Sequence, residues 1–95
     1  MKKIILLTGA SSGIGNQTAK SLAKEGHVVY GAARRIEKME TLKQFGVKPI
    51  YLDVTDEESI KSSIDTIIEN EGRIDVLINN AGYGSFGAVE DVEIN

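Results

Sequence analysis

The chain has 95 residues, 41% of them hydrophobic and 26% charged, which is the length of one small domain and too short for separate cofactor and substrate domains. It has no cysteine and one histidine, so we expect no disulfide, no metal site, and no catalytic cluster built on cysteine or several histidines. Its apolar runs are too short for a signal or a membrane anchor, so we expect a cytoplasmic location and no membrane partner.

Charge is unevenly distributed along the chain. Residues 1–50 hold nine Lys and Arg against three Asp and Glu, a net of +6, whereas residues 51–95 hold two against eleven, a net of −9. The basic half is where an anionic ligand fits best, although these charges also suit solvated helix faces. The overall charge of −3 and the absence of a basic stripe interleaved with aromatic residues predict no nucleic acid partner.

Strands and helices alternate along the chain. In order, the pattern predicts a strand over residues 3–8, a helix over 13–26, a strand over 28–33, a helix over 36–45, a strand over 47–53, a helix from 55 to 72, a strand over 74–79 and the start of a helix over 89–95. Pro49 suits an edge strand, and Thr55 with Glu58 predicts a capping box. Ile14 is expected on the apolar face of the first helix, and the isoleucine stripe of the third helix is expected in the core.

This alternation predicts an α/β fold in which parallel strands are joined by right-handed crossovers. The expected sheet order is 3-2-1-4 with helices on both faces, which is one half of a doubly wound, Rossmann-type sheet. Residues 1–95 would thus form a single, partial domain. The fourth strand would be an edge strand although its apolar sequence is that of an interior strand. We therefore expect self-association, that is, a homo-oligomer.

A glycine-rich segment, TGASSGIG at residues 8–15, lies between the first predicted strand and the first predicted helix. Gly9 suits a tight turn, Gly13 lets a pyrophosphate approach the backbone, and Gly15 lets the helix pack closely on the sheet. The helix N-terminus would then face the phosphates. The alternatives are a glycine-rich turn without a ligand and an NTPase phosphate loop; Asn16 and Gln17, which follow Gly15, argue against the second.

This segment resembles the TGxxxGxG motif of the short-chain dehydrogenase/reductase family. Two further segments are similar to motifs of that family, in the same order: Asp53-Val54 after the third strand, and Asn79-Asn80-Ala81-Gly82 after the fourth. The resemblance implies that Asn79 braces the centre of the sheet and that a nicotinamide dinucleotide binds along the motifs. It implies that the pyrophosphate and ribose are lined by Gly9, Ser11, Ser12, Gly13, Ile14 and Gly15, the adenine by Asp53 and Val54, and the middle of the cofactor by Asn80, Ala81 and Gly82.

The end of the second strand bears on the choice of dinucleotide. NAD-binding folds usually place a carboxylate about 20 residues past the glycines, where it accepts from the ribose 2′-hydroxyl. Ala33 holds that position here, and it is followed by Arg34 and Arg35, whose guanidinium groups suit a 2′-phosphate. We therefore expect NADP in preference to NAD. The alternative is that both arginines are merely solvated.

The catalytic residues that the resemblance implies are not found in this chain. The family uses a tyrosine with a lysine four residues later, together with a serine and an asparagine. None of Tyr30, Tyr51 and Tyr83 is followed four residues later by a lysine. Ser85 and Asn95 lie too early to take the other two roles, and His27 is expected at a surface turn. We therefore predict no catalytic residue among these 95.

The resemblance implies an NADP-dependent oxidoreductase that moves a hydride between nicotinamide and a small carbonyl or alcohol substrate, with this chain as its nucleotide-binding N-terminal part. A chain of this kind alone is predicted to be inactive. Two alternatives remain open, namely a non-enzymatic dinucleotide-binding module or half-fold fragment, and a regulatory sensor. A reading frame that continues into a Tyr-x-x-x-Lys segment would favour the enzyme, and a stop after residue 95 would favour the module.

Overall fold

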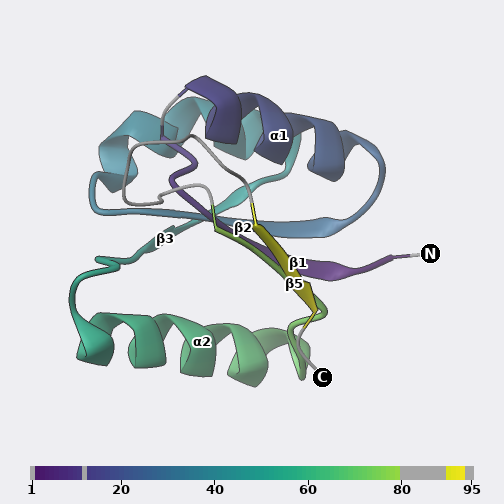
Figure 1. Cartoon of the computed structure of the whole chain (residues 1–95). Helices are drawn as coiled ribbons and strands as arrows, with labels where there is room; N and C mark the ends of the chain where they lie inside the picture. Colours follow the sequence, from purple (N-terminus) through teal and green to yellow (C-terminus); the bar gives the residue numbers. More distant parts are fainter. Residues whose placement is uncertain (1, 12, 80–89, 94–95) are drawn as a thin grey trace.

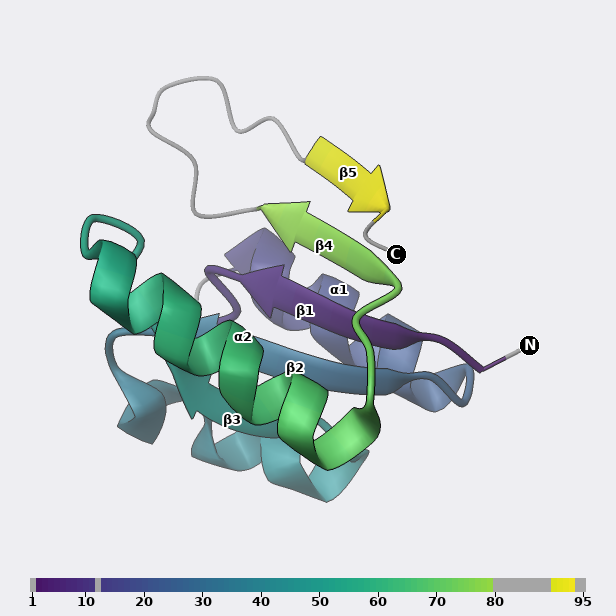
Figure 2. The same ribbon diagram turned by 90° about the horizontal axis from the view of Figure 1, so that it is seen from below.

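The computed structural model describes residues 2–11, 13–79 and 90–93, and in this part of the chain five strands form one sheet. The elements are, in chain order, β1 (Ile4–Thr8), α1 (Gly13–Lys24), β2 (Val28–Ala33), the 3-10 helix η1 (Ile36–Phe45), β3 (Lys48–Tyr51), α2 (Glu57–Glu71), β4 (Val76–Asn79) and β5 (Glu90–Glu93). The sheet order is β3-β2-β1-β4-β5, and β1 to β4 are parallel (Figure 2). Helices α1 and η1 cover one face and α2 the other (Figure 1). The predicted order 3-2-1-4 with helices on both faces is confirmed.

Strand β1 lies at the centre of the core. All five of its residues are buried, and it pairs with β2 on one side and β4 on the other. Because successive side chains of a strand point to opposite faces, Ile5 and Leu7 join the apolar cluster under α1 and η1. Ile4 and Leu6 join the cluster that packs against α2. Both layers of the molecule are therefore held by one continuous apolar strand.

The second helix is a 3-10 helix. Its apolar residues Ile36, Met39, Leu42 and Phe45 recur every third position. A 3-10 helix has three residues per turn, so this spacing puts all four on one side. Met39 and Leu42 are fully buried, whereas Phe45 at the end is 46% exposed and lies under the Lys20 ammonium, 4.8 Å from the ring centre. The sequence predicted a helix here, and the recurrence of apolar residues at every third position indicates that the helix is of the 3-10 type.

Two local expectations about helix starts are wrong. Ile14 is 63% exposed, because Ala19, which is buried, comes five positions later, and five positions correspond to a rotation of about 140° around the helix axis. Thr55 does not cap α2. The N-cap is Asp56, whose side chain accepts from the Glu58 N–H at 3.0 Å. The carboxylate is the stronger acceptor at a helix N-terminus, where it also meets the helix dipole.

The two edges of the sheet differ from each other. Strand β3, which contains Pro49, is an edge, as predicted. The fourth strand is not, because residues 90–93 form β5 and pair with it in antiparallel register, Val76 opposite Glu93 and Asn79 opposite Glu90. The expected helix start in this segment is therefore wrong for residues 90–93. Pairing satisfies backbone groups on the outer side of β4, which outweighs the local helical pattern.

Opposite the carboxyl ends of the strands, one ionic cluster ties α2 to the sheet. The Tyr30 hydroxyl donates to the Glu71 Oε2 at 2.6 Å, and the Lys48 Nζ lies 3.1 Å from the same oxygen. The Lys48 ammonium also lies 5.4 Å from the centre of the Tyr30 ring. The tyrosine hydrogen bond, followed by the lysine one, lowers the pKa of the Glu71 carboxyl.

We expect this cluster to make stability depend on pH in the acid range. Since the pKa of Glu71 is lowered by folding from its ordinary value of about 4.5, the contribution of Glu71 to stability is fully present above that pH and is lost as the pH falls through the folded pKa. Glu71→Gln should lower the free energy of unfolding at pH 7 by about 1 kcal/mol. Urea unfolding between pH 7 and pH 3 measures this. The difference between wild type and variant should shrink toward pH 3, and a difference independent of pH would contradict this origin.

Candidate functional site

The turn after β1 is fixed by β2. Gly9 has a φ of 71°, in the left-handed region that glycine adopts without strain. The N–H groups of Gly9 and Ala10 both donate to the Ala32 carbonyl, at 2.8 and 3.3 Å. These two amides are therefore engaged in the fold. An anion at this turn would have to meet the amides that follow, up to the first turn of α1, where N–H groups have no partner within the helix.

The same turn packs closely against β2. Gly31 pairs with Leu7 in the sheet, and a Cβ placed on Gly31 would lie 3.0 Å from the Ala10 Cβ and 3.0 Å from the Val47 Cγ1. Such distances are shorter than ordinary carbon contacts. The absence of a side chain at Gly31 therefore allows the turn after β1 to pack closely against β2.

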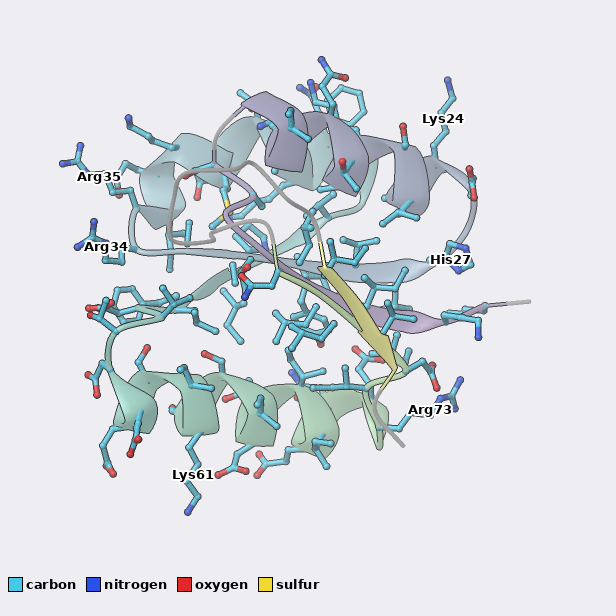
Figure 3. All side chains as sticks on the ribbon, viewed as in Figure 1. Lys24, His27, Arg34, Arg35, Lys61 and Arg73 are labelled. Carbon is cyan, nitrogen blue, oxygen red and sulfur yellow. The ribbon has the colours of Figure 1, made fainter. Side chains whose placement is uncertain are left out.

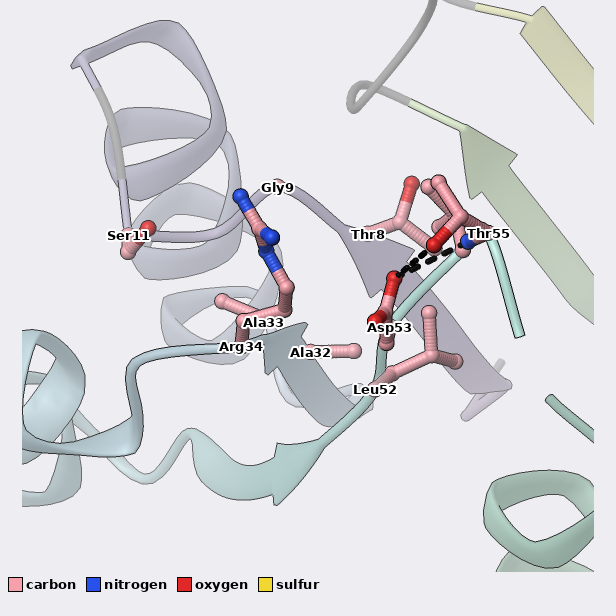
Figure 4. A pocket seen from close by; sticks show the side chains of 10 residues that line it. Thr8, Gly9, Ser11, Ala32, Ala33, Arg34, Leu52, Asp53 and Thr55 are labelled. Atoms are coloured by element: carbon pink, nitrogen blue, oxygen red, sulfur yellow. Dashed lines mark hydrogen bonds between the residues drawn. The ribbon is translucent and has the colours of Figure 1, made fainter. Parts of the chain in front are cut away.

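A cavity of about 270 Å³ opens where β1, β2 and β3 end (Figure 4). Parallel strands bring their carboxyl ends to one edge of the sheet, so residues far apart in sequence meet here. The lining residues are Thr8, Gly9, Ser11, Ala32, Ala33, Arg34, Leu52, Asp53, Val54 and Thr55. One cavity thus combines a guanidinium, a carboxylate and hydroxyl groups with a wall of apolar side chains.

Asp53 is held by hydrogen bonds from the segment that follows it. The Thr55 N–H and hydroxyl donate to its Oδ1 at 3.0 and 2.7 Å (Figure 4). The Asp53 N–H donates to the Ser59 Oγ at 2.9 Å. The Thr55 hydroxyl and then the Thr55 N–H lower the pKa of Asp53, and the positive charge of Arg34 acts in the same direction. At neutral pH Asp53 is therefore an ionised, purely accepting group in the cavity.

A second cavity of about 170 Å³ adjoins the first and shares Thr8, Leu52 and Val54 with it. Its other lining residues are Leu6, Ile60, Ile64, Leu77 and Asn79, most of them apolar. The Thr8 hydroxyl donates to the Asn79 Oδ1 at 2.9 Å and so joins β1 to β4, in the bracing role expected of Asn79.

The residues predicted for the site are brought together in part. Five of them line the first cavity: Gly9, Ser11, Arg34, Asp53 and Val54. Gly13, Ile14 and Gly15 form the start of α1, where Gly15 is buried, and Arg35 lies just before η1 and does not line the cavity. Ser12, Asn80, Ala81 and Gly82 lie outside the described residues.

Sequence reasoning missed Thr55, Thr8 and Leu52 as residues of the site. A signal existed for Thr55, because an Asp accepts readily from the backbone and side chain two residues later. Thr8 is the first residue of the TGxxxGxG-like segment but was given no role in the site, and Leu52 carried no signal beyond its place at the end of a predicted strand.

His27 lies at the opposite end of the sheet from Arg34 and Arg35 (Figure 3). Its Nδ1 accepts from the Lys3 N–H at 3.1 Å, and its N–H donates to the Leu22 carbonyl. The histidine thus holds the entry to β1, in keeping with the turn position expected for it.

A parallel sheet in this order, with a cavity at the carboxyl ends of its strands, defines an α/β protein of Rossmann type. Residues 3–95 match the family model described as short chain dehydrogenase. The chain belongs to this family.

Individual relatives agree with the family. The chain is 47% identical over 88 residues to a 3-ketodihydrosphingosine reductase of Bacteroides thetaiotaomicron, covering 93% of this chain and 31% of that protein. It is 45% identical over 87 residues to an NADPH-dependent 1-acyldihydroxyacetone phosphate reductase of Saccharomyces cerevisiae, covering 85% and 29%. A crystal structure of an F189W actinorhodin polyketide ketoreductase with NADPH superimposes with a TM-score of 0.75 at 36% identity, covering 85% and 34%. The chain spans about a third of the length of these relatives.

The close packing at Gly31 yields a prediction about stability. Gly31→Ala should lower the free energy of unfolding by about 1–3 kcal/mol, because the added methyl group meets packed atoms on two sides. Gly13→Ala is the matched control, since a Cβ there meets nothing within 4 Å, and it should change stability by less than about 1 kcal/mol. Urea unfolding at neutral pH measures both. Equal stability of the Gly31 variant and wild type would show that the turn is not held against β2 by this contact.

Proposed function

We propose that this chain is the dinucleotide-binding part of an NADP-dependent oxidoreductase that reduces a carbonyl or oxidises an alcohol by hydride transfer. The observation that carries the proposal is the joint lining of one cavity by Arg34, Ser11 and Asp53, at the carboxyl ends of three parallel strands. Arg34 and Ser11 can bind an anion, and the Asp53 carboxylate can accept a hydrogen bond from a donor of the ligand. A 2′-phosphorylated adenosine has both.

The proposed pose places each predicted residue. The 2′-phosphate lies at Arg34, with Arg35 adding positive charge nearby, and the adenine lies against Asp53 and Val54. The pyrophosphate lies along the turn and the start of α1, formed by Gly9, Ser11, Ser12, Gly13, Ile14 and Gly15. The middle of the cofactor lies along Asn80, Ala81 and Gly82, as the family resemblance implies.

Two observations favour NADP over NAD. Ala33, which ends β2, offers no carboxylate to a free 2′-hydroxyl, and the Arg34 guanidinium lines the cavity beside it. The yeast relative is named as NADPH-dependent, and the polyketide ketoreductase structure contains NADPH.

The chemistry of hydride transfer belongs to the cofactor when it is bound, and this chain's residues bind and orient it. No residue of this chain is proposed as catalytic. A small carbonyl or alcohol is the proposed substrate class of a protein that includes this chain together with the remaining family motifs. The non-enzymatic alternative is a dinucleotide-binding module with the same cavity and no turnover.

Three further expectations belong with this proposal. Among the described residues, no helix is long and apolar enough to cross a membrane. A cytoplasmic location and a single partial domain over residues 1–95 remain proposals that rest on the sequence. The expected homo-oligomeric state loses the basis given for it, because β5 pairs with the edge of β4 that was expected to be open.

Arg34→Ala should weaken NADP binding about tenfold or more and leave NAD binding within about threefold, because only NADP carries the phosphate. Isothermal titration calorimetry with both dinucleotides measures this. Lys61→Ala is the control. Lys61 lies on the outer face of α2 (Figure 3), so this substitution also removes one positive charge, but at a place away from the cavity. Equal losses for NAD and NADP, or a wild type that binds NAD more tightly, would contradict the NADP proposal.

The 95-residue chain alone should bind NADPH but not turn it over. The rate of NADPH oxidation is measured from the absorbance of NADPH in the presence of a panel of ketones and aldehydes. This rate should equal the rate measured without protein. A rate above that background would show that catalytic groups are present in this chain.

A further inference from the structure

We infer that Thr55 is a positioning residue that fixes the Asp53 carboxylate and thereby makes the cavity select a 6-aminopurine over a 6-oxopurine. The inference rests on the proposed function, because it assigns adenine to the Asp53 side of the cavity. It goes further in assigning a role to Thr55, and in stating that the substituent at position 6 of the purine is recognised by the Asp53 carboxylate.

The first observation is the division between the two carboxylate oxygens of Asp53. The Thr55 hydroxyl and the Thr55 N–H both donate to Oδ1, at 2.7 and 3.0 Å (Figure 4). Two donors on one oxygen fix the rotation of the carboxylate about its last bond. Oδ2 is then the oxygen that can accept from a ligand.

The second observation is that the backbone of Asp53 is fixed as well. Its N–H donates to the Ser59 Oγ at 2.9 Å, which ties the segment after β3 to the first turn of α2. Asp53 is thus held at both ends, by Ser59 at the backbone and by Thr55 at the carboxylate. Ordering of this group is completed before a ligand arrives, so binding does not have to supply it.

The third observation concerns the surroundings of Asp53. Leu52 and Val54 line the first cavity on either side of it in sequence, and both also line the adjoining apolar cavity. A flat base suits these apolar side chains, with its polar edge at the carboxylate. Arg34 at the same cavity attracts the anionic part of the ligand, so the two ends of a 2′-phosphoadenosine are recognised by opposite charges.

A fixed, ionised carboxylate discriminates between purines at position 6. The amino group of adenine donates to it, whereas the carbonyl oxygen of hypoxanthine brings a second acceptor against it. A carboxylate that rotated freely could turn away from the carbonyl oxygen of hypoxanthine, which would weaken the repulsion. The binding of adenine would then also have to order the carboxylate, which would make the free energy of adenine binding less favourable. Removing the Thr55 hydroxyl should therefore weaken adenine binding more than hypoxanthine binding.

The test compares dissociation constants for NADP and for nicotinamide hypoxanthine dinucleotide phosphate by isothermal titration calorimetry. We expect wild type to prefer the adenine form about tenfold or more, and Thr55→Val to reduce this preference about three- to tenfold. Thr55→Ser keeps the hydroxyl and should restore the preference. Thr66→Val is the matched control, because it removes an exposed threonine hydroxyl that bonds only the Ser62 carbonyl within α2.

A pair of Asp53 variants makes the test sharper. In Asp53→Asn the side-chain oxygen can still accept from Thr55, which leaves the amide NH₂ at the place of Oδ2, where it donates to the hypoxanthine carbonyl. This variant should prefer the hypoxanthine form. In Asp53→Asn combined with Thr55→Val the amide can flip, and the reversed preference should fall about three- to tenfold toward equality.

The outcomes separate this inference from the proposed function. A merely structural role of Thr55 would lower stability or weaken both dinucleotides equally, and an unchanged preference in Thr55→Val with NADP binding intact would overturn the inference alone. A folded wild type that binds neither dinucleotide would overturn both. Loss of preference in Thr55→Val, its rescue by Thr55→Ser and the Thr55-dependent reversal in Asp53→Asn would together support the positioning role.

Discussion

The whole arrangement depends on the burial of β1 between β2 and β4. All five β1 residues are buried, so its register with both neighbours is set by apolar packing on two faces. That register brings the end of β1 beside the end of β2, where the Ala32 carbonyl accepts from Gly9 and Ala10. The turn into α1 is therefore shaped by the sheet, and any ligand at the turn meets a backbone that is already ordered.

The parallel topology explains why the candidate site is composed as it is. Ser11, Arg34 and Asp53 are separated by about 20 residues each, because one helix and one strand intervene between successive strand ends. None of the three needs a long loop to reach the cavity. Arg34 and Asp53 both line this cavity, and the positive charge of Arg34 helps to lower the pKa of Asp53, after the two hydrogen bonds from Thr55. The site is thus assembled by strand order and tuned by local hydrogen bonds.

Much of the fold and part of the site could be predicted from the sequence, for identifiable reasons. Apolar runs and the glycine-rich turn fixed β1 and the start of α1, and Pro49 indicated the outer strand. Residues 90–93 could not be assigned, because their pairing is decided by the open edge of β4 and not by their own pattern. The role of Thr55 was hidden for a similar reason: the same residue suits a helix cap and a side-chain turn, and the two compete for one hydroxyl.

The two ends of the sheet are stabilised differently, and this difference leaves the site open. At the amino ends of the strands, the Asp75 side chain accepts from the Ile4 N–H at 2.8 Å and also bonds Arg73, while Tyr30 and Lys48 converge on Glu71. Side chains there satisfy one another and tie α2 and β4 to the centre. At the carboxyl ends Arg34 and Asp53 line a cavity, and Asp53 accepts from Thr55 there through Oδ1 only. Because these contacts at the amino ends stabilise the fold, the charged groups that line the cavity are available for the ligand that we propose.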